Sequence, residues 1–179
     1  MNRLLIKIII IIGLSLISAF NYVYGQDIQD DDAKYATELL KAGTLAPDFQ
    51  LATPAGQTVS LSDYKGKYIV LDFWASWCPD CRKDAPNIVA AYNEFKDRNV
   101  AFIGISFDTD KAAWENAIKK YEIKYTQVSE LKKWKETTVS GKYNINWIPA
   151  MYLIDPEGKV VLGTVISEKL IKKLGEAVK

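Results

Sequence analysis

Apolar runs alternate with amphipathic segments along most of this chain. Two continuous apolar runs predict buried strands, and each is followed by a mixed apolar and polar segment long enough for a helix. Asp108 to Asp110 offer capping residues for the second helix. The predicted elements before residue 125 are strands at 49–51 and 58–60 that form an N-terminal hairpin, a strand at 68–75, a helix at about 79–98, a strand at 100–107 and a helix at about 111–121.

The last third of the chain predicts a second hairpin and a closing helix. The turn residues Asp155-Pro156-Glu157-Gly158 separate two apolar segments, and Ser167 is expected to cap the helix that follows. The predicted elements are a less regular stretch at 134–142, strands at 150–154 and 159–165, and a helix from 167 to 178. Strand-helix-strand followed by a hairpin and a helix predicts an α/β fold, with a central mixed sheet and helices on both faces.

The first 25 residues have the pattern of an export signal. Arg3 and Lys7 precede an apolar stretch at 8–17, and small residues follow at the end of the segment. We therefore expect a signal peptide at residues 1–25 and an exported, periplasmic protein. An uncleaved segment is the alternative, because counting from Leu4 brings the apolar run close to the length of a membrane anchor.

Residues 26–43 open with an aspartate cluster and are expected to form an acidic linker, which leaves 44–179 as one domain. Removing residues 1–25 takes away Arg3 and Lys7 and no acidic residue, which lowers the formal net charge from +1 to −1. A near-neutral chain without a basic stripe lacks the electrostatic footprint of a nucleic-acid binder. We expect a monomer that does not bind nucleic acid.

The only two cysteines, Cys78 and Cys81, follow directly behind the first long apolar strand. Two intervening residues let both sulfurs face each other across the first turn of a helix, where unpaired N–H groups and the helix dipole point at the first sulfur. We expect Cys78 to be the partly exposed nucleophile of low pKa. Cys81 then resolves the mixed disulfide.

Other uses of a CxxC pair fit the composition poorly. Structural zinc needs four ligands, and this chain has no histidine and no third cysteine. Covalent haem attachment needs histidine after the second cysteine, where this chain has Arg82. A purely structural disulfide across two residues would stabilise the fold little. We expect no metal and no cofactor other than the redox-active disulfide.

Five segments of the chain form a recognisable set of motifs: Leu71-Asp72-Phe73-Trp74-Ala75-Ser76-Trp77-Cys78-Pro79-Asp80-Cys81, Pro86, Trp147-Ile148-Pro149-Ala150, Ala46-Pro47-Asp48-Phe49 and Leu61-Ser62-Asp63-Tyr64-Lys65-Gly66-Lys67. Together they resemble the thioredoxin fold, and most closely the exported TlpA/ResA-type thiol-disulfide oxidoreductases. The resemblance covers about residues 44–179. The resemblance implies a thioredoxin-like three-layer fold with an insertion, here roughly residues 111–144, before a cis-proline loop.

The resemblance also implies a groove for a client protein beside the disulfide. The proline that matches Pro149 is cis in the family, and the backbone of Ile148 can pair with an extended client. Trp77, Pro79 and Asp80 are expected to complete the docking surface. The carboxylate of Asp80 would also disfavour a nearby Cys78 thiolate, which makes the pair a stronger reductant.

Two carboxylates are candidates to carry the proton of Cys81. Asp72 lies in an apolar strand and matches the buried aspartate of thioredoxins, while Asp84 corresponds to the acid of many ResA-type proteins. A structural role stays open for both, as an ion pair on a helix face for Asp84 and as a core residue for Asp72.

The leading functional hypothesis is a thiol-disulfide oxidoreductase that reduces exported client proteins. It would receive electrons from a membrane thiol carrier, and ResA-type relatives often serve cytochrome c maturation. The alternatives are a thiol peroxidase of the peroxiredoxin kind and a non-catalytic metal or haem carrier. Ala75-Ser76-Trp77 before the first cysteine argue against the peroxidase, and the lack of histidine argues against the carrier.

Overall fold

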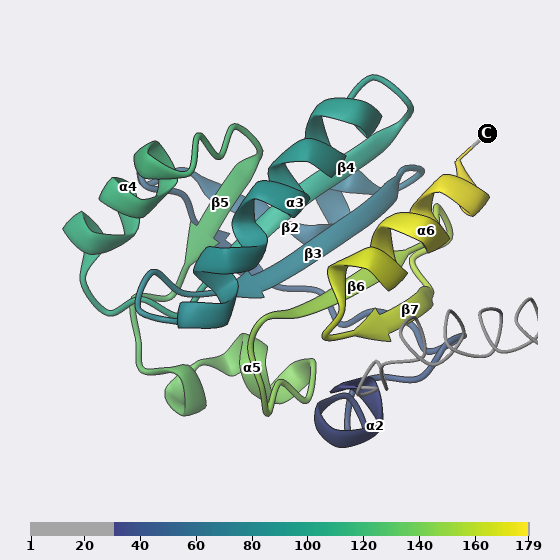
Figure 1. Cartoon of the computed structure of the whole chain (residues 1–179), viewed down its shortest axis with the longest axis horizontal. Helices are drawn as coiled ribbons and strands as arrows, with labels where there is room; N and C mark the ends of the chain where they lie inside the picture. Colours follow the sequence, from purple (N-terminus) through teal and green to yellow (C-terminus); the bar gives the residue numbers. More distant parts are fainter. Residues whose placement is uncertain (1–30, 179) are drawn as a thin grey trace, which may run out of the picture. The chain divides into compact units, whose positions relative to one another are not determined.

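The computed structural model describes residues 31–178, so the export signal predicted at 1–25 lies outside the described residues. These residues build one mixed sheet in the strand order β2-β1-β5-β4-β3-β6-β7 (Figure 1). The strands are β1 (Gln50–Ala52), β2 (Thr58–Ser60), β3 (Tyr68–Trp74), β4 (Val100–Ser106), β5 (Thr126–Ser129), β6 (Ala150–Ile154) and β7 (Val160–Thr164). β3, β4 and β5 are parallel, while β6 and β1 join them antiparallel.

β3 lies in the middle of the sheet because its sequence is apolar on both faces. Parallel strands covered on both sides consist of near-continuous hydrophobic runs, and every residue of β3 after Tyr68 is buried. β4 on one side and β6 on the other complete its hydrogen bonding. The carboxyl end of this strand, where the CxxC sequence follows, is therefore held from both sides.

Helices cover both faces of the sheet, as the sequence predicts. They are α2 (Asp31–Tyr35), α3 (Pro79–Phe95), α4 (Lys111–Lys120), α5 (Thr138–Lys142) and α6 (Ser167–Ala177), with 3-10 turns at Leu61–Tyr64 and Trp134–Glu136. α3 and α6 lie side by side on one face (Figure 1). On the other face, Tyr143 at the end of α5 packs against Phe73. None of the helices formed by residues 31–178 is long and apolar enough to cross a membrane.

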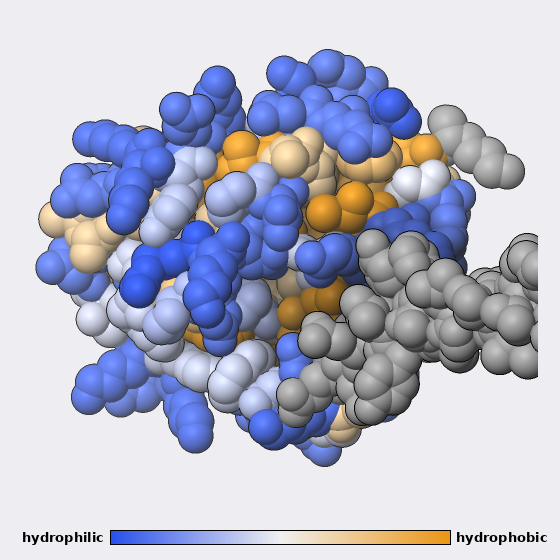
Figure 2. Space-filling view, viewed as in Figure 1, coloured by the Kyte–Doolittle hydropathy of each residue, from blue (hydrophilic) through white to orange (hydrophobic). Residues whose placement is uncertain are grey.

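The outer surface of α3 and α6 is charged. Figure 2 shows this face as mostly hydrophilic, with hydrophobic residues visible between the polar side chains. Arg82 and Lys83 on α3 are exposed, whereas Ala85 and Ile88 on the same helix are buried against the sheet. The helix thus has one apolar stripe, which fixes how its first turn meets the strands.

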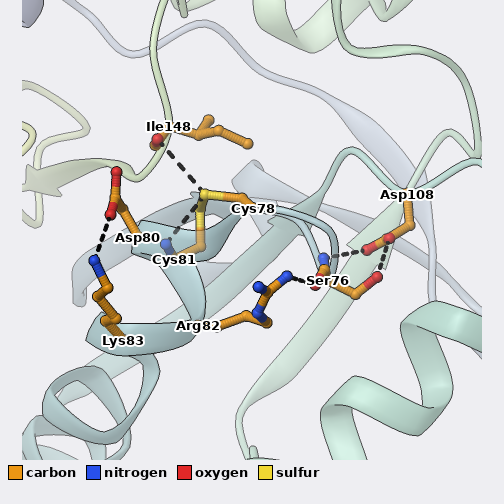
Figure 3. The surroundings of a disulfide bond; sticks show 8 residues. All are labelled: Ser76, Cys78, Asp80, Cys81, Arg82, Lys83, Asp108 and Ile148. Carbon is orange, nitrogen blue, oxygen red and sulfur yellow. Dashed lines mark hydrogen bonds and ion pairs between the residues drawn. A yellow bond between two sulfur atoms is a disulfide. The ribbon is translucent and has the colours of Figure 1, made fainter.

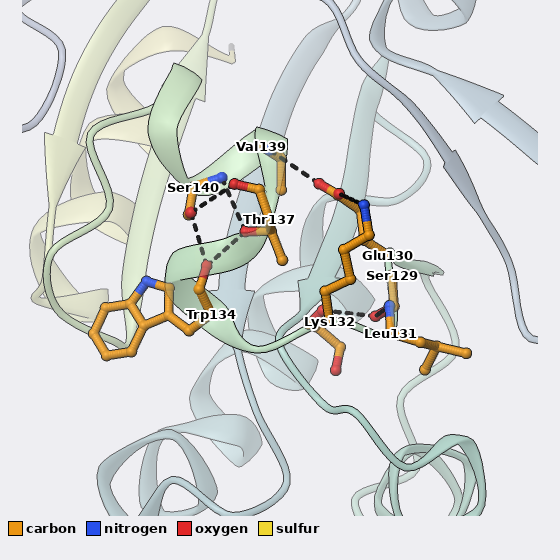
Figure 4. A network of polar contacts seen from close by, with 9 residues as sticks. Ser129, Glu130, Leu131, Lys132, Trp134, Thr137, Val139 and Ser140 are labelled. Atoms are coloured by element: carbon orange, nitrogen blue, oxygen red, sulfur yellow. Dashed lines mark hydrogen bonds and ion pairs between the residues drawn. The ribbon is translucent and has the colours of Figure 1, made fainter.

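The segment around residues 126–145 is more ordered than its sequence predicts. It contains β5, which the sequence pattern did not predict, and two short helices where a less regular stretch was expected. The carbonyl of Trp134 accepts hydrogen bonds from the hydroxyls of Thr137 at 2.7 Å and Ser140 at 2.8 Å (Figure 4). Glu130 accepts a further bond from the N–H of Val139 at 3.0 Å. Hydrogen bonds from polar side chains, which a hydrophobic pattern does not reveal, help to order this stretch.

Residues 31–43, expected as a solvated linker, pack onto the domain instead. The carboxylate of Asp32 accepts hydrogen bonds from the Thr164 hydroxyl and the Val165 N–H, both at 2.8 Å, and pairs with Lys169 at 2.9 Å. Leu39 is buried in the core with 4% of its surface exposed. The compact unit therefore begins at Asp31 and not at residue 44.

Candidate active site

The two cysteines lie at the start of α3, immediately behind the end of β3. Cys78 is the N-cap of the helix, and its sulfur accepts a hydrogen bond from the Cys81 N–H at 3.1 Å (Figure 3). Pro79 occupies the first helical position, where a missing N–H costs nothing. The two residues form a disulfide with their Cα atoms 5.3 Å apart. The sequence prediction of a Cys78–Cys81 pair across the first turn is confirmed.

Exposure does not distinguish the two cysteines. Cys78 has 4% of its surface exposed and Cys81 has 3%, so the prediction of a partly exposed Cys78 is wrong for this disulfide form. Burial results from the cis-proline loop on one side and the helix on the other. What distinguishes Cys78 is its position as the N-cap of the helix, where the N–H of Cys81 points at its sulfur.

The cis-proline loop faces the disulfide. The Ile148–Pro149 peptide bond is cis, as the family resemblance implies. The carbonyl oxygen of Ile148 lies 3.7 Å from the Cys78 sulfur (Figure 3), within reach of an S–H in the reduced state. Trp77, the residue before Cys78, has 51% of its surface exposed. An apolar ring beside the disulfide thus faces outward, where a partner protein can contact it.

A buried carboxylate holds the turn that leads into the CxxC. Asp108 accepts hydrogen bonds from the N–H and the hydroxyl of Ser76 and from the hydroxyl of Ser106 (Figure 3 shows the pair with Ser76). Arg82 donates to the carbonyl of Ser76 at 3.2 Å from the outside. Asp108 was predicted to cap α4, but Asp110 alone does so, accepting from the N–H groups of residues 112 and 113.

Asp72 lies on the face of β3 that carries α3 and is buried with 6% of its surface exposed. Its carboxylate accepts a hydrogen bond from the Tyr125 hydroxyl at 2.9 Å. Burial raises the pKa of Asp72 to about 7; the Tyr125 hydrogen bond opposes this rise, and the charge of Asp84 adds to it. A carboxyl group with this pKa can accept or release a proton near neutral pH.

Asp84 lies one turn beyond Cys81 on α3 and is half-buried. It accepts hydrogen bonds from the Ser167 hydroxyl at 2.5 Å and from Asn87 at 3.0 Å. Burial raises the pKa of Asp84, and these two bonds oppose the rise. Ser167 was predicted to cap α6, but the N-cap of that helix is Ile166, and the serine joins α6 to Asp84 instead.

A cavity brings both candidate proton carriers to the second cysteine. Its volume is about 10 Å³, near the lower limit for one water molecule. Its lining residues are Asp72, Trp74, Cys81, Asp84, Ala85, Ile88, Ile123, Tyr125 and Pro149. Cys78 does not line it. Of the two cysteines, only Cys81 therefore borders the cavity that Asp72 and Asp84 line.

A wider groove adjoins this cavity at the surface. It has a volume of about 330 Å³. Its lining residues are Asp31, Tyr35, Asp80, Asp84, Trp147, Pro149, Val165, Ile166, Ser167 and Glu168. The ring of Tyr35 from α2 stacks on that of Trp147 at 4.0 Å. Asp80 pairs with Lys83 at 3.3 Å in solvent (Figure 3). Within residues 31–178, no group of three or more histidine, cysteine or acidic side chains is arranged to hold a metal ion.

Asp108, Tyr125 and Ser167 are the site residues that sequence reasoning missed. Asp108 had a usable signal, because it follows the end of β4, the parallel neighbour of β3, and carboxyl ends of parallel strands share one edge. Ser167 was noticed but given the wrong partner. Tyr125 had no signal, since β5 itself was not predicted.

A disulfide at the N-terminus of a helix, beside a cis-proline and with a buried carboxylate lining the same small cavity, defines a thiol-disulfide oxidoreductase of the thioredoxin fold. Comparisons with known proteins agree. The sequence profile of the AhpC/TSA family matches residues 42–162. ResA of a Bacillus cereus strain, a thiol-disulfide oxidoreductase, is 32% identical over 160 residues, which covers 89% of this chain and 86% of ResA.

Further relatives extend the comparison to a second sequence and to a solved structure. ResA of Bacillus subtilis (strain 168) is 34% identical over 124 residues, covering 69% of this chain and 67% of that protein. The thioredoxin domain of a thiol-disulfide oxidoreductase from Bacteroides vulgatus superposes with a TM-score of 0.72 at 35% identity, covering 78% of this chain and 99% of that domain. This chain belongs to the AhpC/TSA family and, within it, to the ResA-type thiol-disulfide oxidoreductases.

Proposed function

We propose that the protein reduces disulfides of exported client proteins and that the Cys78–Cys81 dithiol supplies the electrons. The observation that carries this proposal is the cavity shared by Cys81 and Asp72, which gives the resolving thiol a proton acceptor. The reducing direction is further supported by Ile148 before the cis-proline and by the buried Asp72, which resemble the reducing members of the fold more than the oxidising ones.

The reaction proceeds in two displacements. The Cys78 thiolate attacks one sulfur of the client disulfide, forms a mixed disulfide and expels the first client thiolate, which takes a proton from water. The Cys81 thiol then gives its proton to the Asp72 carboxylate and attacks the Cys78 sulfur. The second client thiolate leaves and is protonated. Two electrons have passed to the client, and the protein holds the Cys78–Cys81 disulfide.

The client segment is proposed to lie in the wide groove beside the disulfide. The Ile148 carbonyl beside the Cys78 sulfur offers a backbone acceptor to an extended peptide. Trp77, directly before Cys78, adds an exposed ring, and the exposed Pro79 with the groove residues Asp80 and Pro149 would complete the contact surface. Clients are folded or unfolded exported proteins that carry a disulfide; cytochrome c maturation is one setting for such clients.

The proposal includes an exported, periplasmic protein. Disulfides persist outside the reducing cytoplasm, so a reductant there finds substrates but loses its own dithiol with each turnover. A membrane thiol carrier would regenerate the Cys78–Cys81 dithiol by the same exchange chemistry in reverse order. Neither step needs a metal, a further cofactor or nucleic acid, and a monomer contains the whole site.

Trapping of clients tests this proposal. Cys81→Ser should accumulate mixed disulfides through Cys78, because attack still occurs and resolution does not. The matched control is Cys78→Ser, which should trap nothing. Adducts are resolved on non-reducing gels and identified by mass spectrometry. Adducts on Cys78→Ser, with none on Cys81→Ser, would reverse the two roles, and none on either variant would contradict the proposal.

A further inference from the structure

Tyr125 is a buried tyrosine that the thiol chemistry described so far does not use. It lies immediately before β5 and has 5% of its surface exposed. Its hydroxyl donates to Oδ2 of Asp72 at 2.9 Å, across a separation of 53 residues. It also lines the small cavity that contains Cys81 and Asp72. Tyr125 is therefore placed beside the proposed proton acceptor and not merely within the core.

The surrounding structure fixes the ring of Tyr125. Tyr92 from α3 packs against it with ring centroids 5.6 Å apart, and Phe102 from β4 does so at 5.9 Å. In the sheet register, Asp72 lies opposite Gly104, and Gly104 lies opposite Gln127. A side chain at position 104 would collide with that of Gln127, which lies over Gly104 and accepts a hydrogen bond from the Trp74 indole on β3.

We propose that Tyr125 is a positioning residue for proton transfer, whose hydroxyl holds the Asp72 carboxyl group in place beside Cys81 so that it can take the Cys81 proton. The inference rests on the proposed role of Asp72. It adds a specific donor that supports this role and that comes from a segment outside the CxxC helix and the cis-proline loop.

Among the groups around Asp72 described below, Tyr125 is the one that favours the ionised form of its carboxyl group. From α3, Asp84 adds a like charge that raises the pKa of Asp72, and Cys81 brings a thiol. The neighbouring strands present Gly104 and Met151 opposite Asp72, and neither carries a charge. Burial is the main cause that raises this pKa, and the hydrogen bond from Tyr125 lowers it. Without this bond, the pKa of Asp72 would be higher, and a smaller fraction of the carboxyl group would be ionised at neutral pH.

Tyr125 itself keeps its proton under these conditions. Burial raises its pKa well above the ordinary value, and the charge of Asp72 and the hydrogen bond to it raise the pKa further. The hydroxyl is therefore a permanent donor across the pH range in which Asp72 titrates. It positions and stabilises the carboxylate but does not exchange the proton.

The test is Tyr125→Phe, which keeps the ring and removes the hydroxyl. Loss of a hydrogen bond to the ionised form should raise the Asp72 pKa by about one unit or more. The pKa is measured by NMR titration of the Asp72 carboxyl carbon in the reduced protein. Tyr64→Phe is the matched control, because its hydroxyl contacts Thr126 at 3.2 Å beside β5 and not Asp72. An unchanged Asp72 pKa in Tyr125→Phe would overturn the inference.

A kinetic measurement separates this inference from the proposed role of Asp72. Stopped-flow records how fast Cys81 expels thionitrobenzoate from a Cys78 mixed disulfide across pH. Tyr125→Phe should shift the profile to higher pH, and Tyr125→Phe combined with Asp72→Asn should be no slower than Asp72→Asn alone. If the Asp72 pKa rises in Tyr125→Phe but the pH profile of the resolution rate does not move, the hydrogen bond between Tyr125 and Asp72 stands and the proton role of Asp72 is contradicted. Additive losses in the double variant would overturn the positioning role.

Discussion

Asp72 is the residue at which stability and function oppose each other. Its carboxyl group is buried in an apolar strand, and burial raises its pKa from 3.8 to about 7. Well below pH 4 the group is protonated in both the folded and the unfolded protein, and it does not change the free energy of unfolding. As pH rises from 4 to 7, the unfolded chain ionises first. Asp72 therefore lowers stability progressively over this window and fully above pH 7.

Replacement of Asp72 by asparagine should remove this pH-dependent cost. At roughly 1.4 kcal/mol per pKa unit, Asp72→Asn should raise the free energy of unfolding by up to a few kcal/mol at pH 8 and change it little at pH 4. Urea unfolding of the disulfide form at the two pH values measures the difference. Equal effects at both pH values would show that the Asp72 pKa is not raised in the folded state.

The same substitution should slow the step in which Cys81 resolves the mixed disulfide near neutral pH. Asp84→Asn is the matched comparison, because Asp84 lines the same cavity and burial also raises its pKa. Slow resolution in Asp72→Asn alone assigns the proton to Asp72. Slow resolution in Asp84→Asn alone would transfer the role to that residue. The sequence leaves open which of the two carboxylates takes the proton, and a comparison of these two resolution rates decides it.

At the scale of elements, the turn between β3 and α3 depends on the neighbouring strand. Asp108 follows β4 and is buried with 2% of its surface exposed, where it accepts hydrogen bonds from Ser76 and Ser106. Ser76 is two residues before Cys78. The position of Cys78 is therefore set by β4 as well as by its own strand and helix.

Asp108→Asn should lower stability and also slow the attack of Cys78. Loss of bonds to a buried charged acceptor costs roughly 1–3 kcal/mol, and the loosened turn misplaces the sulfur. Asp110→Ala is the control, since it removes the cap of α4 at a cost of about 1 kcal/mol without touching the turn. Denaturant unfolding and reaction with a small disulfide are compared in both variants. A rate for Asp108→Asn equal to that of Asp110→Ala would refute a positioning role for Asp108.

Elements with a strong local pattern could be predicted from the sequence. β3, β4 and α3 form where continuous apolar runs and a proline at the helix start indicate them. β5 has four residues with Gln127 in a buried position, and this pattern does not distinguish a strand from a loop. β5 forms because it pairs with β4, and the sequence of residues 126–129 alone does not reveal this pairing. For the same reason, the contact between Tyr125 and Asp72 could not be predicted.

At the scale of the whole molecule, the sequence predicts one thioredoxin-like domain at residues 44–179. The structure shows that residues 31–43 also pack onto this domain. An acidic cluster indicates a solvated linker when each residue is considered alone. Asp32 instead meets Thr164, Val165 and Lys169, residues more than 130 positions away. Tyr35 from the same segment stacks on Trp147 beside the cis-proline loop. These N-terminal residues are thus part of the domain, and Asp31 and Tyr35 line the groove proposed for clients.

The reduction potential of the Cys78–Cys81 pair tests the central claim most directly, because it decides which way electrons flow between this protein and its clients. Equilibration of the purified protein with glutathione or dithiothreitol buffers, followed by thiol alkylation and mass spectrometry, gives the ratio of dithiol to disulfide. A reductant of client disulfides should have a potential near that of thioredoxin, about −270 mV. A value near −120 mV, typical of a strong oxidant such as DsbA, would contradict the proposed direction.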